Sequence, residues 1–244
     1  MKIGIAIPTY NEAGNIEKLV TEIYRQLSKL SNLQVMVLVI DDDSPDGTAD
    51  IVRKISKKIS NKNFQVNVLQ RTMKDGFGRA YIAGFHELLK SKPDYIIQMD
   101  ADLSHNPVYL PAFVKAASKY DFIVGSRYVS GGETPDWTFS RKILSRAGNF
   151  YTRAILGSKI SDYTGGFNMF STPLMKRIDP DTIDSAGYGF LIDLKYRGIK
   201  NASSVHEIPI VFNDRQHGTS KMPKSTIVKN LILVPRIKFR KNAS

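Results

Sequence analysis

The sequence predicts an α/β fold, with one Rossmann-like, mostly parallel sheet flanked by helices in a single domain. Three observations support this prediction. Short runs rich in β-branched residues alternate with helical patterns along the first hundred residues, which is typical of a doubly wound sheet. The run at 35–40 is continuously apolar, as in a parallel strand buried on both faces. The 244 residues contain no internal repeat and no break in composition that would mark a second domain.

The first half of the chain supplies four of the expected strands. They cover residues 2–7, 35–40, 64–69 and 95–99, and the helices between them run from Asn11 to about residue 30, from 48 to 59 and from 79 to 90. Asn11 is the expected N-cap of the first helix, because Asn side chains accept hydrogen bonds from the first free N–H groups. The acidic turn at 41–46 is expected to cap the second helix in the same way.

The second half continues with further helices and strands. We expect helices over 108–119, 141–156 and 190–197, strands over 122–125 and 205–212, and a mobile Gly-rich loop over 129–138 that carries Trp137. Pro209 indicates an edge or bulge position in the last strand. The domain is expected to cover 1–221, followed by a basic amphipathic segment at 222–244. Within it, 226–234 is either an interfacial or partner-docking helix, or a terminal helix packed on the core.

Composition restricts the classes of function. The chain has 35 Lys and Arg against 23 Asp and Glu, a net charge of +12, which favours an anionic partner such as nucleic acid, a membrane surface or a phosphorylated substrate. It has no Cys, which excludes disulfides, thiolate metal sites and cysteine nucleophiles. No apolar run approaches the roughly 18 residues of a membrane span, and the start resembles no signal peptide, so we expect a cytosolic protein.

Polar and acidic residues follow three of the expected strands. Asp100 and Asp102 end the strand at 95–99, Asp41 and Asp42 follow the strand at 35–40, and Tyr10 lies just beyond the first strand. Ligands of open α/β sheets bind outside the carboxyl ends of the strands. Two adjacent carboxylates repel each other unless a cation lies between them, and Mg²⁺ often shares such oxygen ligands with substrate phosphates. The sequence therefore predicts a metal and phosphate site at this edge.

The glycine pattern excludes the common nucleotide loops. Gly76-Phe77-Gly78 lacks the third glycine of a dinucleotide fingerprint and does not follow the first strand, and no Walker A sequence is present. A nucleoside diphosphate bound through a metal ion is the natural ligand that remains.

Five segments in order resemble the dolichol-phosphate (polyprenol-phosphate) mannosyltransferases of glycosyltransferase family 2. The resemblance extends from Lys2 to about Lys221. The segments are Ile-Pro-Thr-Tyr-Asn-Glu at 7–12, Ile-Asp-Asp-Asp-Ser-Pro-Asp-Gly-Thr at 40–48, Met-Asp-Ala-Asp-Leu-Ser-His-Asn-Pro at 99–107, Gly-Ser-Arg-Tyr at 125–128 and Arg-x-x-Gly-x-Ser-Lys at 215–221.

The resemblance implies a GT-A fold and an inverting, metal-dependent transfer of a hexose from a nucleotide sugar to a lipid phosphate. GDP-mannose is the implied donor and a polyprenyl or dolichyl phosphate the implied acceptor. The residues that would bind the nucleotide sugar are Pro8, Tyr10, Glu12, Ile40, Asp42, Asp100, Ala101, Asp102, Ser104 and Arg127.

The resemblance also assigns a metal site and a phosphate site. Asp100 and Asp102 would bind Mg²⁺ or Mn²⁺, and Asp102 and Arg127 would be the catalytic residues. The acceptor phosphate would be bound by Arg127, Arg215, Ser220 and Lys221. The implied setting is peripheral, on the cytosolic face of a membrane, with a membrane-anchor subunit as a further partner. An ionised acceptor phosphate needs no dedicated base; for a hydroxyl acceptor, Asp193 is the nearest candidate.

The sequence departs from the family pattern at Leu191, Asp193 and Asn168, and these departures leave the donor sugar open. UDP-glucose is the second candidate donor, and another family-2 acceptor, such as a growing polysaccharide, is the next alternative. From a different class, the chain would be a non-catalytic module that binds nucleic acid or a membrane. The acidic strand ends argue against nucleic acid, because they would repel its phosphates.

Overall fold

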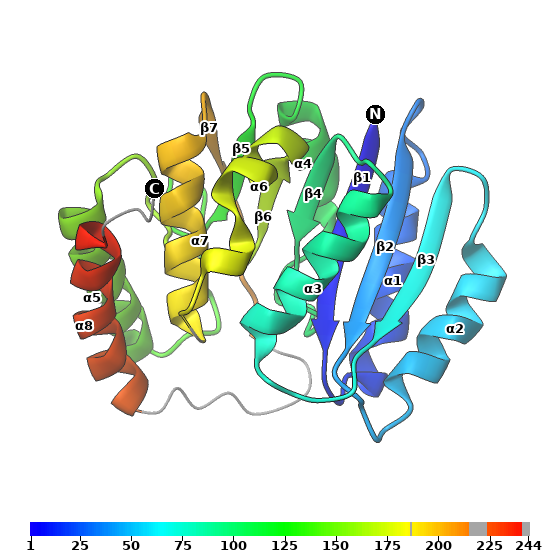
Figure 1. The fold of residues 1–244 in the computed structure, drawn as a ribbon, viewed down its shortest axis with the longest axis horizontal. Coiled ribbons are helices and arrows are strands. Elements are labelled where there is room, and N and C mark those ends of the chain that lie inside the picture. Colours follow the sequence, from blue (N-terminus) through cyan, green and yellow to red (C-terminus); the bar gives the residue numbers. More distant parts are fainter. Residues whose placement is uncertain (186, 215–223, 241–244) are drawn as a thin grey trace.

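The computed structural model describes residues 1–185, 187–214 and 224–240, with the backbone alone for Tyr188 and 224–230. Its strands form one seven-stranded sheet in the order β3-β2-β1-β4-β6-β5-β7 (Figure 1). All neighbours are parallel except β6, which is antiparallel to both β4 and β5. The strands are β1 (Lys2–Thr9), β2 (Gln34–Asp41), β3 (Phe64–Gln70), β4 (Tyr95–Gln98), β5 (Phe122–Ser126), β6 (Asn168–Ser171) and β7 (Val205–Pro209). The predicted fold class is confirmed.

Helices cover both faces of the sheet. In Figure 1, α3, α6 and α7 lie in front of it, α1 and α4 lie behind it, and α5 and α8 stand together at the end beyond α7. The helices are α1 (Ala13–Leu27), α2 (Thr48–Ile59), α3 (Phe77–Lys90), α4 (Leu110–Ala116), α5 (Phe139–Leu156), α6 (Thr172–Ile178), α7 (Tyr188–Asn201) and α8 (Lys224–Phe239). Of the helices described, none is both long enough and apolar enough to cross a bilayer.

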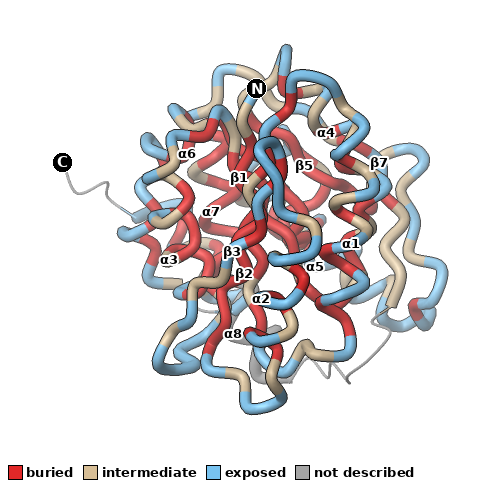
Figure 2. The backbone as a smooth tube through the Cα atoms, turned by 90° about the vertical axis from the view of Figure 1, so that its right-hand side faces the viewer, coloured by how far each residue is buried: buried red, intermediate tan, exposed pale blue. Residues whose placement is uncertain are grey.

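The core has two parts, one on each face of the sheet. Alternation along β1 shows the division, since Ile3, Ile5 and Ile7 join the cluster under α1, α2 and α4, while Ala6 joins the cluster under α3, α6 and α7. Figure 2 shows the buried backbone concentrated in the central strands and the helix faces that cover them. Gly84 allows α3 to lie close to the sheet, because a Cβ there would stand 2.7 Å from the Ile40 side chain.

Two details of the expected elements are wrong. Asn11 does not cap α1: the N-cap residue is Glu12, and Asn11 has a left-handed backbone (φ 59°) where the chain turns sharply after β1. The sequence analysis also missed β6 and α6. The four residues of β6, Asn168–Ser171, are too few to show alternation, so their place between β4 and β5 is visible only in the folded chain.

A third detail is also wrong, because the acidic turn at 41–46 does not supply the N-cap of α2. The N-cap residue is Gly47 (φ 81°), which has no side-chain cap, although Asp46 accepts a hydrogen bond from the Thr48 N–H at 3.0 Å. The expected place of Pro209 is confirmed, since it ends β7, which lies at the edge of the sheet. Trp137 is buried, with the Arg141 guanidinium 4.2 Å from its ring centre, so it packs within its loop in this structure. The mobility of that loop stays a prediction.

Candidate active site

Three parallel strands bring the predicted acidic residues to one edge. β1 lies between β2 and β4, and its register pairs Pro8 with Ile40 and Ala6 with Gln98. The carboxyl ends of the three strands therefore lie side by side, as the sequence predicted. We call this the β1–β2–β4 edge, defined by Tyr10, Asp42, Asp100 and Asp102.

Asp42 forms one side of this edge. It is buried, and its Oδ1 accepts a hydrogen bond from Arg71 Nη1 at 2.7 Å. Arg71 also pairs with Asp75 at 2.5 Å, so the loop after β3 is tied across the end of β2. Nearby, the Lys74 ammonium lies 3.5 Å from the centre of the half-exposed Tyr10 ring. The sequence analysis missed Arg71 and Lys74, because nothing in their loop shows that it folds over the preceding strand.

Asp41 and Asp42 are adjacent in sequence, but their carboxylates have different hydrogen-bond partners. The Asp41 carboxylate accepts hydrogen bonds from the Thr9 hydroxyl (2.9 Å) and from the backbone and side chain of Ser44 (2.9 and 2.6 Å). These bonds occupy it within the turn, whereas Asp42 pairs with Arg71 from the loop after β3. A role of Asp42 in binding a nucleoside stays a prediction.

Three of the predicted nucleoside contacts have different surroundings. The Ile40 side chain is fully buried against α3, so only its backbone could reach a nucleoside. Pro8 is half-buried at the end of β1. Glu12 accepts a hydrogen bond from the Asn15 side chain at 2.7 Å, at the start of α1. Their roles in binding stay predictions.

Asp100 is oriented by two neighbours. Its Oδ1 accepts a hydrogen bond from the Tyr81 hydroxyl at 2.7 Å, and its N–H donates to His105 Nδ1 at 2.9 Å. His105 is buried and stacks on Phe167, with ring centres 5.2 Å apart. Burial lowers the pKa of His105 although Asp100 opposes the shift, so the ring is neutral at pH 7 and carries its proton on Nε2. His105 therefore holds the turn rather than acting as an acid or base.

Asp102 lies deeper than Asp100. It is 4 % exposed, and its Oδ1 accepts hydrogen bonds from the Ser104 N–H (3.1 Å) and hydroxyl (2.5 Å). Ala101, between the two carboxylates, is buried in the core cluster. Ser104 is thus a support for Asp102, and its predicted contact with the nucleotide sugar stays untested.

The surroundings of the two carboxylates fit a divalent cation. Oxygen ligands are those that Mg²⁺ and Mn²⁺ prefer, and Gly166 leaves space beside Asp100, because a Cβ there would lie 3.4 Å from both carboxylate oxygens. Among the described residues, no group of three or more His, Asp or Glu side chains could hold a metal. Asp100 and Asp102 would therefore need ligands from the substrate to complete the coordination.

Arg127 forms a second centre with a partner that the sequence analysis missed. Its Nε and Nη2 each lie 2.7 Å from a carboxylate oxygen of Asp162, and Nη2 also donates to the Thr164 hydroxyl at 2.8 Å. Arg127 is 8 % exposed and Asp162 is fully buried. Burial alone would raise the pKa of Asp162, but the Arg127 guanidinium outweighs it and holds the pKa far below its usual range.

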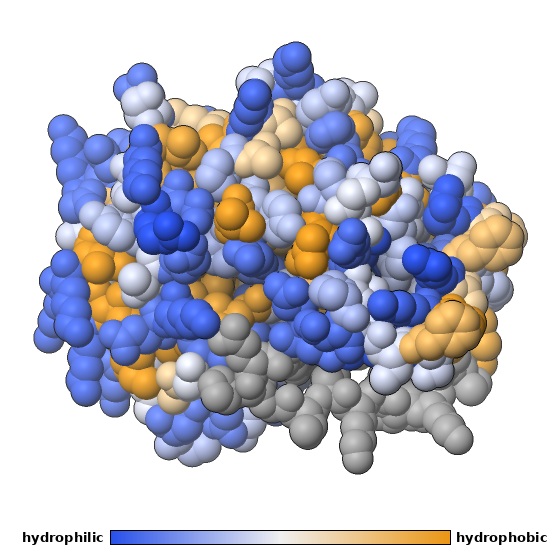
Figure 3. Space-filling model, turned by 180° about the vertical axis from the view of Figure 1, so that it is seen from behind, coloured by the Kyte–Doolittle hydropathy of each residue, from blue (hydrophilic) through white to orange (hydrophobic). Residues whose placement is uncertain are grey.

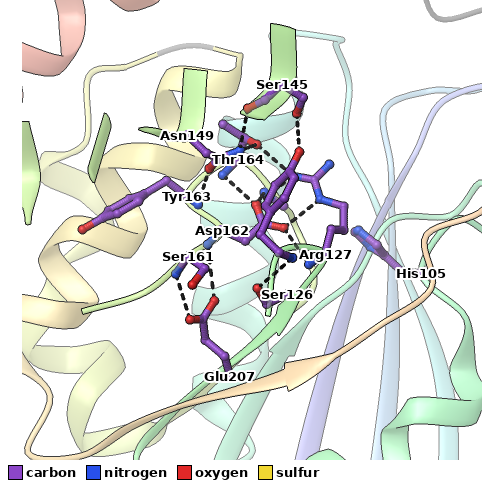
Figure 4. Close-up of polar contacts among 12 residues, drawn as sticks. His105, Ser126, Arg127, Ser145, Asn149, Ser161, Asp162, Tyr163, Thr164 and Glu207 are labelled. Carbon is purple, nitrogen blue, oxygen red and sulfur yellow. Dashed lines mark hydrogen bonds and ion pairs between the residues drawn. The ribbon is translucent and has the colours of Figure 1, made fainter. Parts of the chain in front are cut away.

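Two more charged groups hold the loop around Asp162. Glu207, from β7, accepts hydrogen bonds from the backbone N–H of Ser161 at 2.8 Å and of Asp162 at 3.3 Å (Figure 4). Lys195, from α7, donates to the Asp162 carbonyl at 2.6 Å, and burial lowers its pKa to about 8. We call Arg127, Asp162, Thr164, Lys195 and Glu207 the Arg127 network.

The three departures from the family pattern are buried. Asn168 donates to the Gln98 side chain at 2.9 Å, between β6 and β4, and Leu191 lies in the core. Asp193 pairs with Arg197 (3.0 Å) and Arg240 (3.2 Å), which makes it an anchor between α7 and α8. Arg215, Ser220 and Lys221, together with His217, lie outside the described residues.

Comparison with known proteins gives the family. The model of "Glycosyl transferase family 2" matches residues 4–179. An undecaprenyl-phosphate mannosyltransferase of Micrococcus luteus is 39% identical over 97% of this chain and 93% of its own, and a polyprenol monophosphomannose synthase of Mycolicibacterium smegmatis is 39% identical over 91% of this chain and 82% of its own.

Solved structures share the fold at low identity. The mannosyltransferase PcManGT of Pyrobaculum calidifontis, in complex with GDP-Man and Mn²⁺, has a TM-score of 0.60 and 16% identity and covers 98% of this chain and 70% of its own. Glucosyl-3-phosphoglycerate synthase of Mycobacterium tuberculosis, with Mn²⁺ and UDP, has a TM-score of 0.63 and 17% identity over 97% of this chain and 78% of its own. The chain therefore belongs to glycosyl transferase family 2 and is a glycosyltransferase, as its five motifs indicated.

Proposed function

We propose that this chain transfers a mannosyl group from GDP-mannose to a polyprenyl phosphate, with inversion at the anomeric carbon and with Mg²⁺ or Mn²⁺. The observation that carries the substrate class is the 39% identity, over nearly its whole length, to a relative named as an undecaprenyl-phosphate mannosyltransferase. The β1–β2–β4 edge supports the same proposal, because it offers a nucleoside side at Asp42 and a metal side at Asp100 and Asp102.

The chemistry is one displacement at the sugar carbon. An acceptor phosphate oxygen forms the new bond while the bond to the GDP oxygen breaks, and GDP leaves with the electron pair. Asp100 and Asp102 would hold a divalent cation, with Tyr81 and Ser104 orienting the two carboxylates. When bound, the cation would neutralise the charge that develops on the leaving diphosphate. The acceptor phosphate is already ionised at pH 7 and needs no general base.

Arg127 would direct the acceptor phosphate toward the sugar. Asp162 fixes the plane of its guanidinium through two hydrogen bonds, and charge-assisted contacts from a fixed guanidinium suit phosphate oxygens. From the sequence alone, Arg215, Ser220 and Lys221 are the further residues proposed to bind the acceptor phosphate. The enzyme would act as a peripheral protein on the cytosolic face of a membrane, with a membrane-anchor subunit as a further candidate partner.

Thermal shift with nucleotides tests the donor and the metal together. We expect GDP with Mn²⁺ to raise the melting temperature more than the sum of GDP alone and Mn²⁺ alone, because neither carboxylate pair nor diphosphate completes the metal site by itself. UDP and dTDP, each with and without Mn²⁺, are the matched controls. A larger effect of UDP would favour UDP-glucose as the donor. Shifts with DNA but with no nucleotide would favour the nucleic-acid module.

A transfer assay tests the acceptor. We expect radiolabelled mannose to move from GDP-mannose to a polyprenyl phosphate and not to the matched polyprenol, which differs only in lacking the phosphate. Equal transfer to the two acceptors would contradict the role given to Arg127.

A further inference from the structure

Three aromatic rings lie around the Arg127 guanidinium. The ring centres of Tyr128, Trp137 and Phe212 are each 5.3 Å from its central carbon, close enough for a cation to be attracted to a ring. In the view from behind, by contrast, hydrophobic side chains lie in separate groups among hydrophilic ones (Figure 3). Asp162 holds the guanidinium through two hydrogen bonds, so the position of Arg127 depends on these rings as well as on a carboxylate.

Phe212 is the ring of the three that also reaches the metal side of the site. It meets the His105 ring edge to face, with ring centres 5.7 Å apart. His105 accepts the hydrogen bond from the Asp100 N–H at 2.9 Å. Because His105 is buried and stacks on Phe167, it offers Phe212 a fixed support. One side chain therefore contacts both the turn that carries Asp100 and the guanidinium of Arg127.

The backbone of Phe212 is tied to the loop that carries Trp137. The Phe212 N–H donates to the Glu133 carbonyl at 2.9 Å, and the Glu133 N–H donates to the Ile210 carbonyl at 3.0 Å. These bonds form a short parallel bridge between Glu133 and Val211, beyond the end of β7. The Trp137 ring meets the Phe212 ring edge to face, with centres 5.7 Å apart. Phe212 is therefore held through its backbone and its ring by the same loop.

The chain just beyond Phe212 is anchored twice at Asp214. The Asp214 N–H donates to the Asp136 carboxylate at 2.9 Å, and the Asp214 carboxylate pairs with Arg141 at 2.7 Å. Arg215 follows directly in the sequence. Phe212 and Asp214 therefore determine where the segment 215–221, which is proposed to bind the acceptor phosphate, leaves the described part of the fold.

Phe212 contributes little to the hydrophobic core. It is half-buried and, among the described residues, belongs to neither of the two core clusters. Its ring contacts are with His105, Trp137 and Arg127 instead. A ring that only filled space in the core would lower stability when it was removed. Removal of the Phe212 ring should instead loosen Arg127 with little change in the free energy of unfolding, and this difference separates the two roles.

We propose that Phe212 is a positioning residue of the transfer reaction. Supported by the fixed His105 ring, it holds the Arg127 guanidinium at one distance from Asp100 and Asp102, and it sets the point from which the segment 215–221 begins. The acceptor phosphate at Arg127 and the donor sugar at the β1–β2–β4 edge then meet in line for the displacement. This inference deepens the proposed function and rests on it for the phosphate-binding role of Arg127.

The kinetics of Phe212→Leu test this role. Leucine keeps most of the apolar volume but presents no ring to Arg127 or His105. We expect kcat for mannose transfer to fall about 10–100-fold, because a misplacement of about 1 Å can lower a rate by about 10²-fold. The KM for GDP-mannose should stay within about twofold of the wild-type value. Phe212→Tyr, which keeps the ring, should recover most of kcat. The matched control is Tyr120→Leu, which removes a half-buried ring stacked on His206 (centres 4.5 Å apart) at the other end of β5 and β7 and should keep the wild-type kcat.

Trp137 measures acceptor binding separately. It is the one tryptophan of the chain, and its ring centre lies 5.3 Å from the central carbon of the Arg127 guanidinium. We expect its fluorescence to change on titration with farnesyl phosphate, a short polyprenyl phosphate. The dissociation constant should rise by no more than about threefold in Phe212→Leu, because alignment matters chiefly in the transition state. The thermal shift with GDP and Mn²⁺ should equal that of the wild type, which verifies the fold and the donor site.

The outcomes separate this inference from the proposed function. Mannose transfer by the wild type, with a kcat of Phe212→Leu equal to that of Tyr120→Leu, would contradict the inference alone. So would a loss of affinity for farnesyl phosphate as large as the loss of kcat, or a kcat of Phe212→Tyr no higher than that of Phe212→Leu. A wild type that transfers no mannose, or whose Trp137 fluorescence does not respond to farnesyl phosphate, would contradict the proposed acceptor site and the inference with it.

Discussion

The β1–β2–β4 edge and the Arg127 network lie at the same end of the sheet but are built on opposite plans. At the edge, the Asp100 side chain is 42% exposed, and of the side chains that the structure describes only Tyr81 donates a hydrogen bond to it. In the network, Asp162 is fully buried and receives hydrogen bonds from Arg127, Thr164 and Gly165. At the edge, Asp100 keeps its charge open to solvent and to a ligand, whereas the network uses its charges to hold one arginine.

The difference predicts two kinds of damage. A change at the edge removes a ligand contact and leaves packing almost intact, because water can replace the ligand. A change in the network leaves a buried charge without its counterion, which destabilises the fold as well as the site. Substitutions at the edge should therefore lower activity without lowering stability, whereas substitutions in the network should lower both.

The largest expected effect is that of Asp102→Asn on catalysis. The amide oxygen can still accept the Ser104 hydrogen bonds, but the negative charge that the metal needs is lost. We expect mannose transfer to fall by about 10²–10³-fold or more, as when one electrostatic contact to a developing charge is removed, while the denaturation midpoint changes little. The matched control is Asp43→Asn, an exposed carboxylate after β2, which should keep full activity. Turnover like that of the wild type in Asp102→Asn would rule out the metal assignment.

The sequence predicted the edge well because each part of it is local. A short apolar strand followed at once by Asp42, or by Asp100 and Asp102, is visible in a few residues, and parallel topology then brings the ends together. Arg71 and Lys74 were missed for the same reason, since their contacts depend on how a loop returns over β2.

The network was predicted only at Arg127. Asp162 is 35 residues away in sequence, in a stretch that is typical of a turn, and the only signal is a polar residue before two glycines. Lys195 stands among apolar residues of α7, where a lysine is normally exposed. The antiparallel β6 brings these elements together. A strand of four residues is too short to show the alternation of buried and exposed side chains that would predict it.

The next largest effect is that of Asp162→Asn on stability. It removes the buried carboxylate that pairs with the Arg127 guanidinium, so we expect the free energy of unfolding to fall by about 3–5 kcal/mol, measured by urea denaturation. Adding Arg127→Met should recover part of this loss, because it removes the buried charge that Asp162 balances. Asp50→Asn, which breaks the exposed pair with Arg53, is the matched control and should change little. A loss no larger than in Asp50→Asn would show that the network is not built around this pair.

A smaller effect should appear in the pH dependence of stability. Burial lowers the pKa of Lys195 to about 8 in the folded chain, against 10.5 as its ordinary value. Between these values the unfolded chain holds a proton that the folded chain has released, so stability rises with pH, by at most about 1.4 kcal/mol per pH unit. We expect the free energy of unfolding of the wild type to rise relative to that of Lys195→Met as the pH rises from 8 to 10, measured by urea denaturation at each pH. A difference between the two proteins that stays constant, or that shifts in favour of Lys195→Met, would contradict the lowered pKa.

The smallest effect should be that of Tyr81→Phe at the edge. The ring remains stacked on Phe190, with centres 6.2 Å apart, and only the hydroxyl that donates to Asp100 is lost. Asp100 is open to water, so the fold should keep its stability. The carboxylate becomes freer to turn, and a neutral hydrogen bond of this kind contributes about 1 kcal/mol. We expect the Mn²⁺ concentration for half of the GDP-dependent thermal shift to rise about fivefold, with no such change in the control Tyr24→Phe on α1. If Tyr81→Phe lowered stability as much as Asp162→Asn, the two regions would not differ in plan, and Asp100 would belong to the buried framework and not to the ligand edge.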